Sequence, residues 1–358
     1  MNADELIRRY KAGERDFSGV DLQGADLSGE TLNGINLNHA NLSGAYLSNV
    51  ELHDADLSHA NLTHAELDAA QLNSANLSYS DLRHADLSCA ELDRANLNHA
   101  NLTHANLDTA QLENAELINA DLSDTNIENI NLINANLTGA NLSRMQALQS
   151  FLVNSNLSSA DLSNVQFTDV NLEGANLSQA NLSLAYLNVY LTGANLSNAN
   201  LTRANLTDVC GLSEANLSGA KLTAALYSYC PDSPAEFDLT QAGAILVGEG
   251  ADLSGMDLSN VRLYGCELSE VNFSHTNLSG ALLHSNHLTK ANFSFANLFG
   301  ADLSDADLSY ANLSNANLAN ADLSRANLSH ANLTKATFCN TIMPDGSVRN
   351  DNCEQGSM

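Results

Sequence analysis

The chain has 358 residues, of which 42 are acidic and 14 basic, and its formal net charge is −28. It has no tryptophan and only 5% aromatic residues, fewer large side chains than an ordinary globular core of this length needs. The negative charge argues against direct binding of nucleic acid or an anionic membrane. It is compatible with a basic partner, with mimicry of DNA, or with solubility alone.

Residues 1–15 are predicted to form an N-terminal capping helix. Asn2 suits the N-cap, Glu5 lies three residues later, and Gly13 suits the residue after the C-cap. This segment is charged and has no apolar run, so it does not resemble a signal peptide, and no stretch is apolar enough to span a membrane. We therefore expect a cytoplasmic protein without membrane contact.

A five-residue pattern recurs from Phe17 to Phe338 with few breaks, as in Ala55-Asp56-Leu57-Ser58-His59. On an α-helix five residues advance about 500°, so the leucines would scatter around the cylinder. On a flat strand successive leucines would point to opposite faces. One apolar face results only if the chain bends the same way every five residues. The leucine and the small residue two positions before it then point inward, and each coil stacks on the next.

This pattern resembles the pentapeptide repeat proteins, whose consensus A-(D/N)-L-S-x stands unchanged at residues 25–29 and 301–305. The resemblance covers most of the chain and implies an all-β fold, a right-handed quadrilateral β-helix with four repeats in each coil. Residues 5–19 and 343–347 look like the ends of cyanobacterial members of the family. Those members include a regulator of heterocyst differentiation that acts through protein partners.

We divide the chain into five parts. They are a capping helix at 1–15, a β-helix at 16–222, a non-repeat excursion at 223–250, a repeat block at 251–340 that continues the solenoid, and a cap and tail at 341–358. The alternative is that the excursion caps a second, separate solenoid. Within it, Ser233-Pro234-Ala235-Glu236 predicts a short helix around 234–242. The step from Leu187 to Leu191 is one residue short and that from Leu206 to Leu212 one too long, which predicts bulges or kinks.

With four repeats per coil, histidines fall into columns on two neighbouring corners. One column holds His39, His59 and His99, with Tyr79 among them, and the next holds His64, His84 and His104. Imidazoles at this spacing could share a metal ion, but only Asp124 could complete a ligand set. We expect solvated, pH-sensitive ladders and assign no metal and no cofactor.

Two groups of outward-facing residues are candidate partner-binding surfaces. The first lies where the repeat falters and comprises Ile133, Leu148, Phe151 and Val153; the alternative is a sequence drift that a neighbouring loop covers. The second lies in the C-terminal block and comprises Tyr264, His275, Phe295, Phe299 and Tyr310, with His275 and Phe295 expected to stack.

The six cysteines show neither a CxxC motif nor metal-ligand spacing. A link between Cys339 and Cys353 would require an oxidising compartment. Since disulfides are rare in a reducing cytoplasm, we expect these thiols to be free.

No catalytic motif is present, and the many carboxylates are expected to line a convex rod instead of a cleft. We predict a monomeric, non-enzymatic protein-interaction scaffold or regulator that presents a rigid acidic β-helical surface to a protein partner. The alternative is a DNA mimic that inhibits or protects a DNA-binding enzyme such as a topoisomerase, as in the quinolone-resistance branch of the family. That branch dimerises through a C-terminal helix, whereas residues 344–358 show no helical apolar pattern. A third interpretation is a purely structural or metal-responsive rod.

Overall fold

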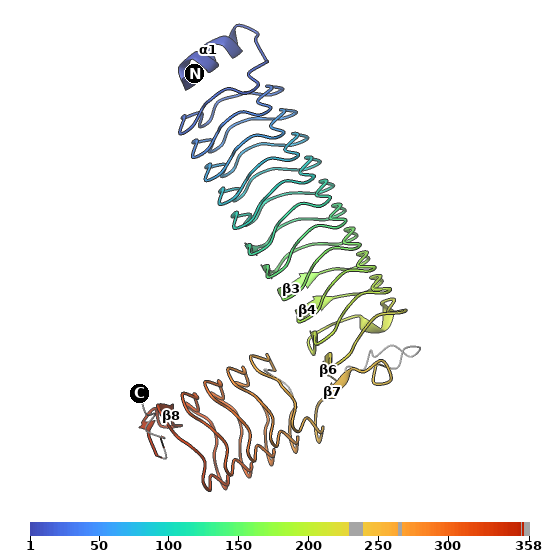
Figure 1. Ribbon diagram of the computed structural model, residues 1–358, viewed down its shortest axis with the longest axis vertical. Helices are drawn as coiled ribbons and strands as arrows, with labels where there is room; N and C mark the ends of the chain where they lie inside the picture. The colour runs from blue at the N-terminus through green and yellow to red at the C-terminus, as the bar shows by residue number, and fades with distance from the viewer. Residues whose placement is uncertain (229–238, 264–266, 352, 354–358) are drawn as a thin grey trace. The chain divides into compact units, whose positions relative to one another are not determined.

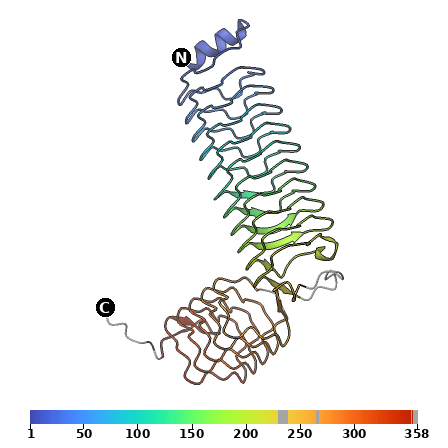
Figure 2. The same ribbon diagram turned by 45° about the vertical axis from the view of Figure 1, so that its right-hand side comes forward.

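The computed structural model describes residues 1–228, 239–263, 267–351 and 353 (Figure 1). The chain divides into two compact units: unit 1 is Met1–Ala225 with Cys230–Ala244, and unit 2 is Leu226–Tyr229 with Ile245–Met358. In each unit the backbone winds as a stack of coils, which Figures 1 and 2 show from two directions.

Each coil contains four repeats, because residues 20 positions apart pair as parallel β-bridges. In unit 1 Asp56 pairs with Asn76, and in unit 2 Asn292 pairs with Asn312. The N–H of Leu57 donates to the carbonyl of Asn76 at 2.7 Å, so the backbone of one coil is bonded to the next. The fold is the right-handed quadrilateral β-helix that the resemblance to the pentapeptide repeat proteins implies.

The core is a narrow column of leucine and small side chains, as the five-residue pattern requires. Leu57 is completely buried and Ala55 is 1% exposed, and this pair repeats along both units. In unit 2 Phe273 and Phe293 replace leucine on adjacent coils, and their rings stack inside the column with centroids 5.1 Å apart. The core therefore needs few large side chains because each coil encloses little volume.

At most described corners the chain makes a turn whose third residue is left-handed. At the corner that ends the repeat 55–59, the N–H of Ala60 donates to the carbonyl of Leu57 at 3.1 Å, and His59 has φ +58°. A positive φ at the third position alone is the signature of a type II turn. Gly, Asn, Asp and His tolerate this region better than other residues, which explains their frequency at the fifth repeat position.

The named elements are short because most of the pairing occurs as single bridges. Unit 1 contains α1 (Ala3–Lys11), β1 (Asn126–Glu128), β2 (Gln146–Leu148), β3 (Gln166–Asn171), β4 (Tyr186–Tyr190), β5 (Asn205–Leu206) and the 3-10 helix η1 (Leu212–Glu214). Strands β1 to β5 pair in order and in parallel. Unit 2 contains the parallel pair β6 (Leu226–Ser228) and β7 (Ile245–Val247) and the antiparallel pair β8 (Thr341–Ile342) and β9 (Val348–Arg349).

Helix α1 begins as its sequence predicts. The side chain of Asn2 accepts a hydrogen bond from the N–H of Glu5 at 2.9 Å, and Gly13 follows the C-cap with φ +101°. Leu6 is completely buried, and the hydroxyl of Tyr10 donates to the carbonyl of Asn33 at 2.8 Å. These contacts attach the helix to unit 1.

Both predicted irregularities are present. The register of β3 and β4 shifts between Thr168 and Val170, and the spacing of paired residues falls to 19 between Asn176 and Asn195. It then rises to 21 between Asn195 and Asn216, where the chain passes through η1. The short step and the long step therefore compensate each other, and the coils remain stacked.

Part of the excursion lies outside the described residues. The predicted helix around 234–242 falls mostly there, and the described part, 239–243, forms a turn that leads to β7. Continuity of the 251–340 block with the first block stays a prediction.

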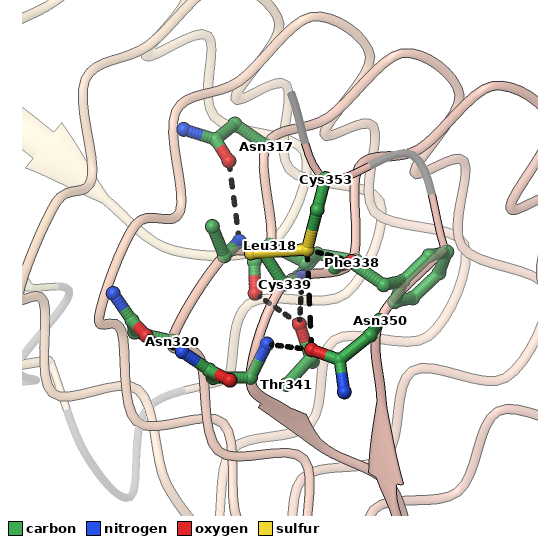
Figure 3. The surroundings of a disulfide bond; sticks show 10 residues. Asn317, Leu318, Asn320, Phe338, Cys339, Thr341, Asn350 and Cys353 are labelled. Carbon is green, nitrogen blue, oxygen red and sulfur yellow. Dashed lines mark hydrogen bonds between the residues drawn. A yellow bond between two sulfur atoms is a disulfide. The ribbon is translucent and has the colours of Figure 1, made fainter. Parts of the chain in front are cut away.

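Cys339 and Cys353 form a disulfide, so the expectation of free thiols was wrong (Figure 3). The chain reverses between β8 and β9 and returns Cys353 to the last coil, where the two Cα atoms lie 5.1 Å apart. The N–H of Asn340 donates to the Asn350 side chain at 2.8 Å across the same reversal. Disulfides persist in oxidising compartments, so the cytoplasmic location stays a prediction.

Candidate partner-binding surfaces

The first surface, here called the apolar patch, consists of Ile133, Leu148, Phe151 and Val153. Leu148 ends β2 and Phe151 begins the next side of the same coil, one on each flank of the corner at Gln149. Ile133 and Val153 occupy equivalent positions on adjacent coils. The corner residue after Ile133, Asn134, donates its N–H to the carbonyl of Val153 on the next coil. The structure therefore brings these predicted residues together.

The patch faces solvent. Leu148 is 39% exposed and Phe151 is 47% exposed, while Ile133 and Val153 are half-buried. A covering loop is therefore not found among the described residues. Elsewhere on these sides of unit 1 the outward positions carry mainly amides, hydroxyls and carboxylates.

Four carboxylates, here called the carboxylate frame, surround the patch: Glu113, Glu128, Asp169 and Glu173. Glu113, Ile133, Val153 and Glu173 form one column at 20-residue spacing, and Glu128 lies one coil before Leu148. Amides of the next residues donate to Glu113 at 3.3 Å and to Glu128 at 3.5 Å. Among the residues that the structure describes, no lysine or arginine forms an ion pair with the frame.

The cation nearest in sequence is already engaged. Arg144 donates to Asp124 through Nε at 2.7 Å, and this bond holds the pKa of the Asp124 carboxyl below its usual value. The residues of the patch were predicted from the sequence, whereas the frame was not. Reading the outward positions at 20-residue intervals would have revealed it, since Glu113 and Glu173 bracket the two apolar residues.

The predicted histidine columns form stacked rings. The centroid distances are 4.7 Å for His39–His59, 4.9 Å for His59–Tyr79, 4.6 Å for Tyr79–His99, 4.9 Å for His64–His84 and 5.1 Å for His84–His104. Parallel rings present their nitrogens side by side. To bind one zinc ion at about 2.1 Å each and at a tetrahedral angle, two nitrogens must lie about 3.4 Å apart. This separation is shorter than the distance between the stacked rings. Stacked in this way, the rings do not converge on an ion.

The second surface, in unit 2, is divided between corners. His275 and Phe295 stack as predicted, with centroids 4.9 Å apart and planes 1° apart. Tyr310 belongs to another corner, where it stacks on His330 at 4.8 Å, a partner that the sequence analysis missed. Phe299 is 47% exposed on the side that follows Phe295. Tyr264 lies outside the described residues.

Within the described ranges, no group of three or more His, Cys, Asp or Glu side chains could hold a metal ion. Of the segments described, none forms a helix with the length and hydropathy that a membrane crossing needs.

A family model for pentapeptide repeats matches the chain over residues 16–54, 51–88, 90–129, 115–147, 152–188, 188–223, 249–274, 266–305 and 306–343. The chain belongs to the pentapeptide repeat family. No curated protein sequence matches this pentapeptide repeat protein.

Solved structures of the family include cyanobacterial proteins. Rfr23 from Cyanothece 51142 is 34% identical over 29% of this chain and 85% of its own, with a TM-score of 0.28. HetL from Nostoc sp. strain PCC 7120, involved in the regulation of heterocyst differentiation, is 28% identical over 98% of this chain and 100% of its own, with a TM-score of 0.17. QnrB1, a plasmid-mediated fluoroquinolone resistance protein, is 18% identical over 58% of this chain and 93% of its own, with a TM-score of 0.34.

Proposed function

We propose that this pentapeptide repeat protein is a non-enzymatic scaffold that binds a protein partner through the apolar patch. The observation that carries the proposal is the exposure of two large side chains, Leu148 and Phe151, on either flank of one corner. The other outward positions of these two sides are mainly polar, although Tyr190, two coils after Phe151, is also exposed. Exposed apolar clusters that are rimmed by polar groups often mark interaction sites, whereas single exposed apolar residues are common and carry no such meaning. Action as a monomer and a cytoplasmic location remain parts of this proposal.

The construction of the wall supports a scaffold. Outward amides bond from coil to coil. In the column of Phe151 the side-chain amide of Asn131 donates to the Gln111 side-chain oxygen at 3.1 Å, and on the following side that of Asn176 donates to Asn156 at 3.0 Å. Among the described residues no buried side-chain nitrogen or oxygen lacks a hydrogen-bond partner. A wall bonded in this way presents the patch in one fixed arrangement, so binding loses little conformational entropy.

The proposal is tested by Phe151→Ser in full-length protein. A partner is first captured by cross-linking in a native extract, identified and purified, and its affinity is then measured by calorimetry. Since a central aromatic anchor carries much of the energy of such a contact, we expect at least about a tenfold loss of affinity, ~1.4 kcal/mol.

The matched control is Tyr46→Ser, because Tyr46 is also an outward aromatic residue of unit 1 and is also 47% exposed. It lies between Asp26 and Glu66 and outside the patch. If both variants bind the purified partner equally well, the apolar patch is not the binding site and the proposal fails.

DNA mimicry is the alternative that the acidic columns favour. Glu66 pairs with Asp86 on the next coil, and Glu51 and Glu91 alternate with Gln71 on another side. Titrating the purified protein into a supercoiling assay with a bacterial type II topoisomerase tests this alternative. Absence of inhibition or protection at micromolar protein would eliminate it.

A further inference from the structure

We infer that the partner segment bound by the apolar patch is a cationic amphipathic helix, with apolar side chains on the patch and lysine or arginine side chains facing the carboxylate frame. This inference rests on the proposed function, since it specifies the chemistry of that partner. It follows from three properties of the surface: its uncompensated charge, its arrangement and its saturated backbone.

The first property is charge. Two basic residues lie near the frame: Arg144, whose guanidinium is bonded to Asp124, and Arg94, whose N–H donates to the Glu113 carbonyl at 3.0 Å. The Arg94 guanidinium forms no ion pair with the Glu113 carboxylate. Glu128, Asp169 and Glu173 are exposed and Glu113 is half-buried, without an ion pair to any described lysine or arginine. A docked partner would partly desolvate these carboxylates, which is unfavourable unless it brings positive charge.

The second property is arrangement. In the column that contains Ile133 and Val153, a carboxylate stands one coil beyond each end, at Glu113 and Glu173. Adjacent coils are about 4.8 Å apart, so an apolar anchor on the patch places its cationic neighbours within reach of the frame. A neutral apolar segment would leave these charges unmatched, and an acidic one would be repelled.

The same arrangement excludes a second copy of this chain as the favoured occupant. In a two-fold symmetric contact the patch of one copy meets the patch of the other. The two carboxylate frames would then face each other, and like charges at an interface disfavour association.

The third property is the saturated backbone. The N–H of Phe151 donates to Ile130 at 2.9 Å, that of Leu152 donates to Asn171 at 2.8 Å, and the carbonyl of Val153 accepts from Asn134 at 2.9 Å. No strand edge is therefore offered at the patch, and β-strand addition is not available. The contact must be made by side chains, which suits a helix because its own backbone is already bonded.

The test uses a fluorescent helical peptide of leucine and lysine with one apolar face, and its binding to the full-length protein is followed by anisotropy. We expect saturable binding that weakens as salt rises. The same peptide with glutamate in place of lysine should not bind, and a scrambled leucine–lysine peptide without an apolar face should bind at least about fivefold more weakly.

Charge variants distinguish the frame from the general acidity of the protein. Glu128→Gln with Glu173→Gln removes two frame carboxylates. Glu51→Gln with Glu91→Gln removes two carboxylates that lie in the column of Phe151 but three or more coils before it, outside the frame. We expect about a fivefold loss of affinity for the first pair and less than twofold for the second. Equal losses, or tighter binding of the scrambled peptide, would overturn the inference. Circular dichroism verifies that both double variants are folded.

The outcomes also separate this inference from the proposed function. If the purified natural partner is lost with Phe151→Ser but binds the frame variant normally, the scaffold proposal stands and the cationic helix is wrong. If Phe151→Ser changes neither the partner nor the peptide, the scaffold proposal itself fails.

Discussion

At the residue scale, the left-handed conformation of the corners accounts for the recurring histidines without any ligand. His39, His59 and His64 all have φ between +57° and +59°. Histidine is among the side chains that tolerate this region, together with Asn and Asp. The histidine columns therefore have a conformational explanation, and their regular spacing follows from the 20-residue coil. Phe295 and Tyr310 adopt the same φ, although bulky residues are rare in this region. The backbone conformation therefore does not explain why these two residues occupy corners.

Among the titratable residues that the structure describes, Asp208 has an environment unlike that of the exposed walls. It lies in the over-long step between Leu206 and Leu212, and its Oδ2 accepts a hydrogen bond from the buried Tyr186 hydroxyl at 3.0 Å. Burial raises the pKa of this carboxyl above its ordinary value, and the hydrogen bonds from Tyr186 and Thr207 offset only part of that effect. The ionised form is thus disfavoured in the folded protein.

The Asp208→Asn variant should therefore be more stable than the wild type at neutral pH, and this advantage should shrink at acid pH. Below the unfolded-state pKa, about 3.9, the carboxyl is protonated in both states and the change has little effect. As pH rises through the raised folded-state pKa, the wild type loses stability that the asparagine variant retains. Differential scanning fluorimetry from pH 3.5 to pH 7 should show the Tm difference growing in favour of the variant. Asp54→Asn, at an exposed corner, serves as the control, and a pH-independent difference would contradict the prediction.

At the scale of elements, irregularities in one coil are compensated in the next. Ala147 in β2 is the small residue at a position normally occupied by leucine, and it pairs with Phe167 in β3. Ala147 is 3% exposed and Phe167 is completely buried. Since both residues are buried and paired, we expect the larger ring to fill space that the alanine leaves, which would match these two repeats to each other instead of to the consensus.

A double-mutant cycle tests this match. Phe167→Leu should leave a void beside Ala147 and cost about 1–2 kcal/mol, and Ala147→Leu should overpack the ring and cost about 1–3 kcal/mol. The double variant restores two leucines, so it should be destabilised by at least about 1 kcal/mol less than the sum. Urea unfolding measures each free energy. Ala147→Leu combined with Phe17→Leu, in the first coil, should be additive; additivity for Phe167 as well would refute the proposed compensation.

For the whole molecule, the period predicted a chain that bends the same way every five residues and buries each leucine and each small residue, whereas the right-handed, four-sided coil was implied by the resemblance to the pentapeptide repeat family. The capping contact of Asn2 with Glu5 was also predictable, since its determinants are local. Two features were not. Phe167 pairs with Ala147 on the preceding coil, and Cys353 reaches Cys339 because the chain reverses after β8. Both depend on contacts between residues distant in sequence, which a repeat consensus does not encode. The patch could be recognised as four departures from the consensus. The identity of its partner could not be predicted, because it depends on the sequence of another molecule.

The excess of carboxylates over basic residues, 42 against 14, makes a further prediction for the whole molecule. Columns such as Glu66 and Asp86 place like charges on paired residues of adjacent coils, about 4.8 Å apart, and this repulsion opposes folding. Salt shortens the screening length from about 10 Å at 0.1 M to about 3 Å at 1 M, so raising NaCl from 0.05 M to 0.5 M should increase the Tm by a few degrees (on the order of 1 kcal/mol). Glu66→Gln with Asp86→Asn should reduce this slope, and an equal osmolality of sucrose controls for effects unrelated to charge. The exposed ion pair of Arg144 with Asp124 weakens with salt, so a falling Tm would show that such pairs outweigh the repulsion of the columns.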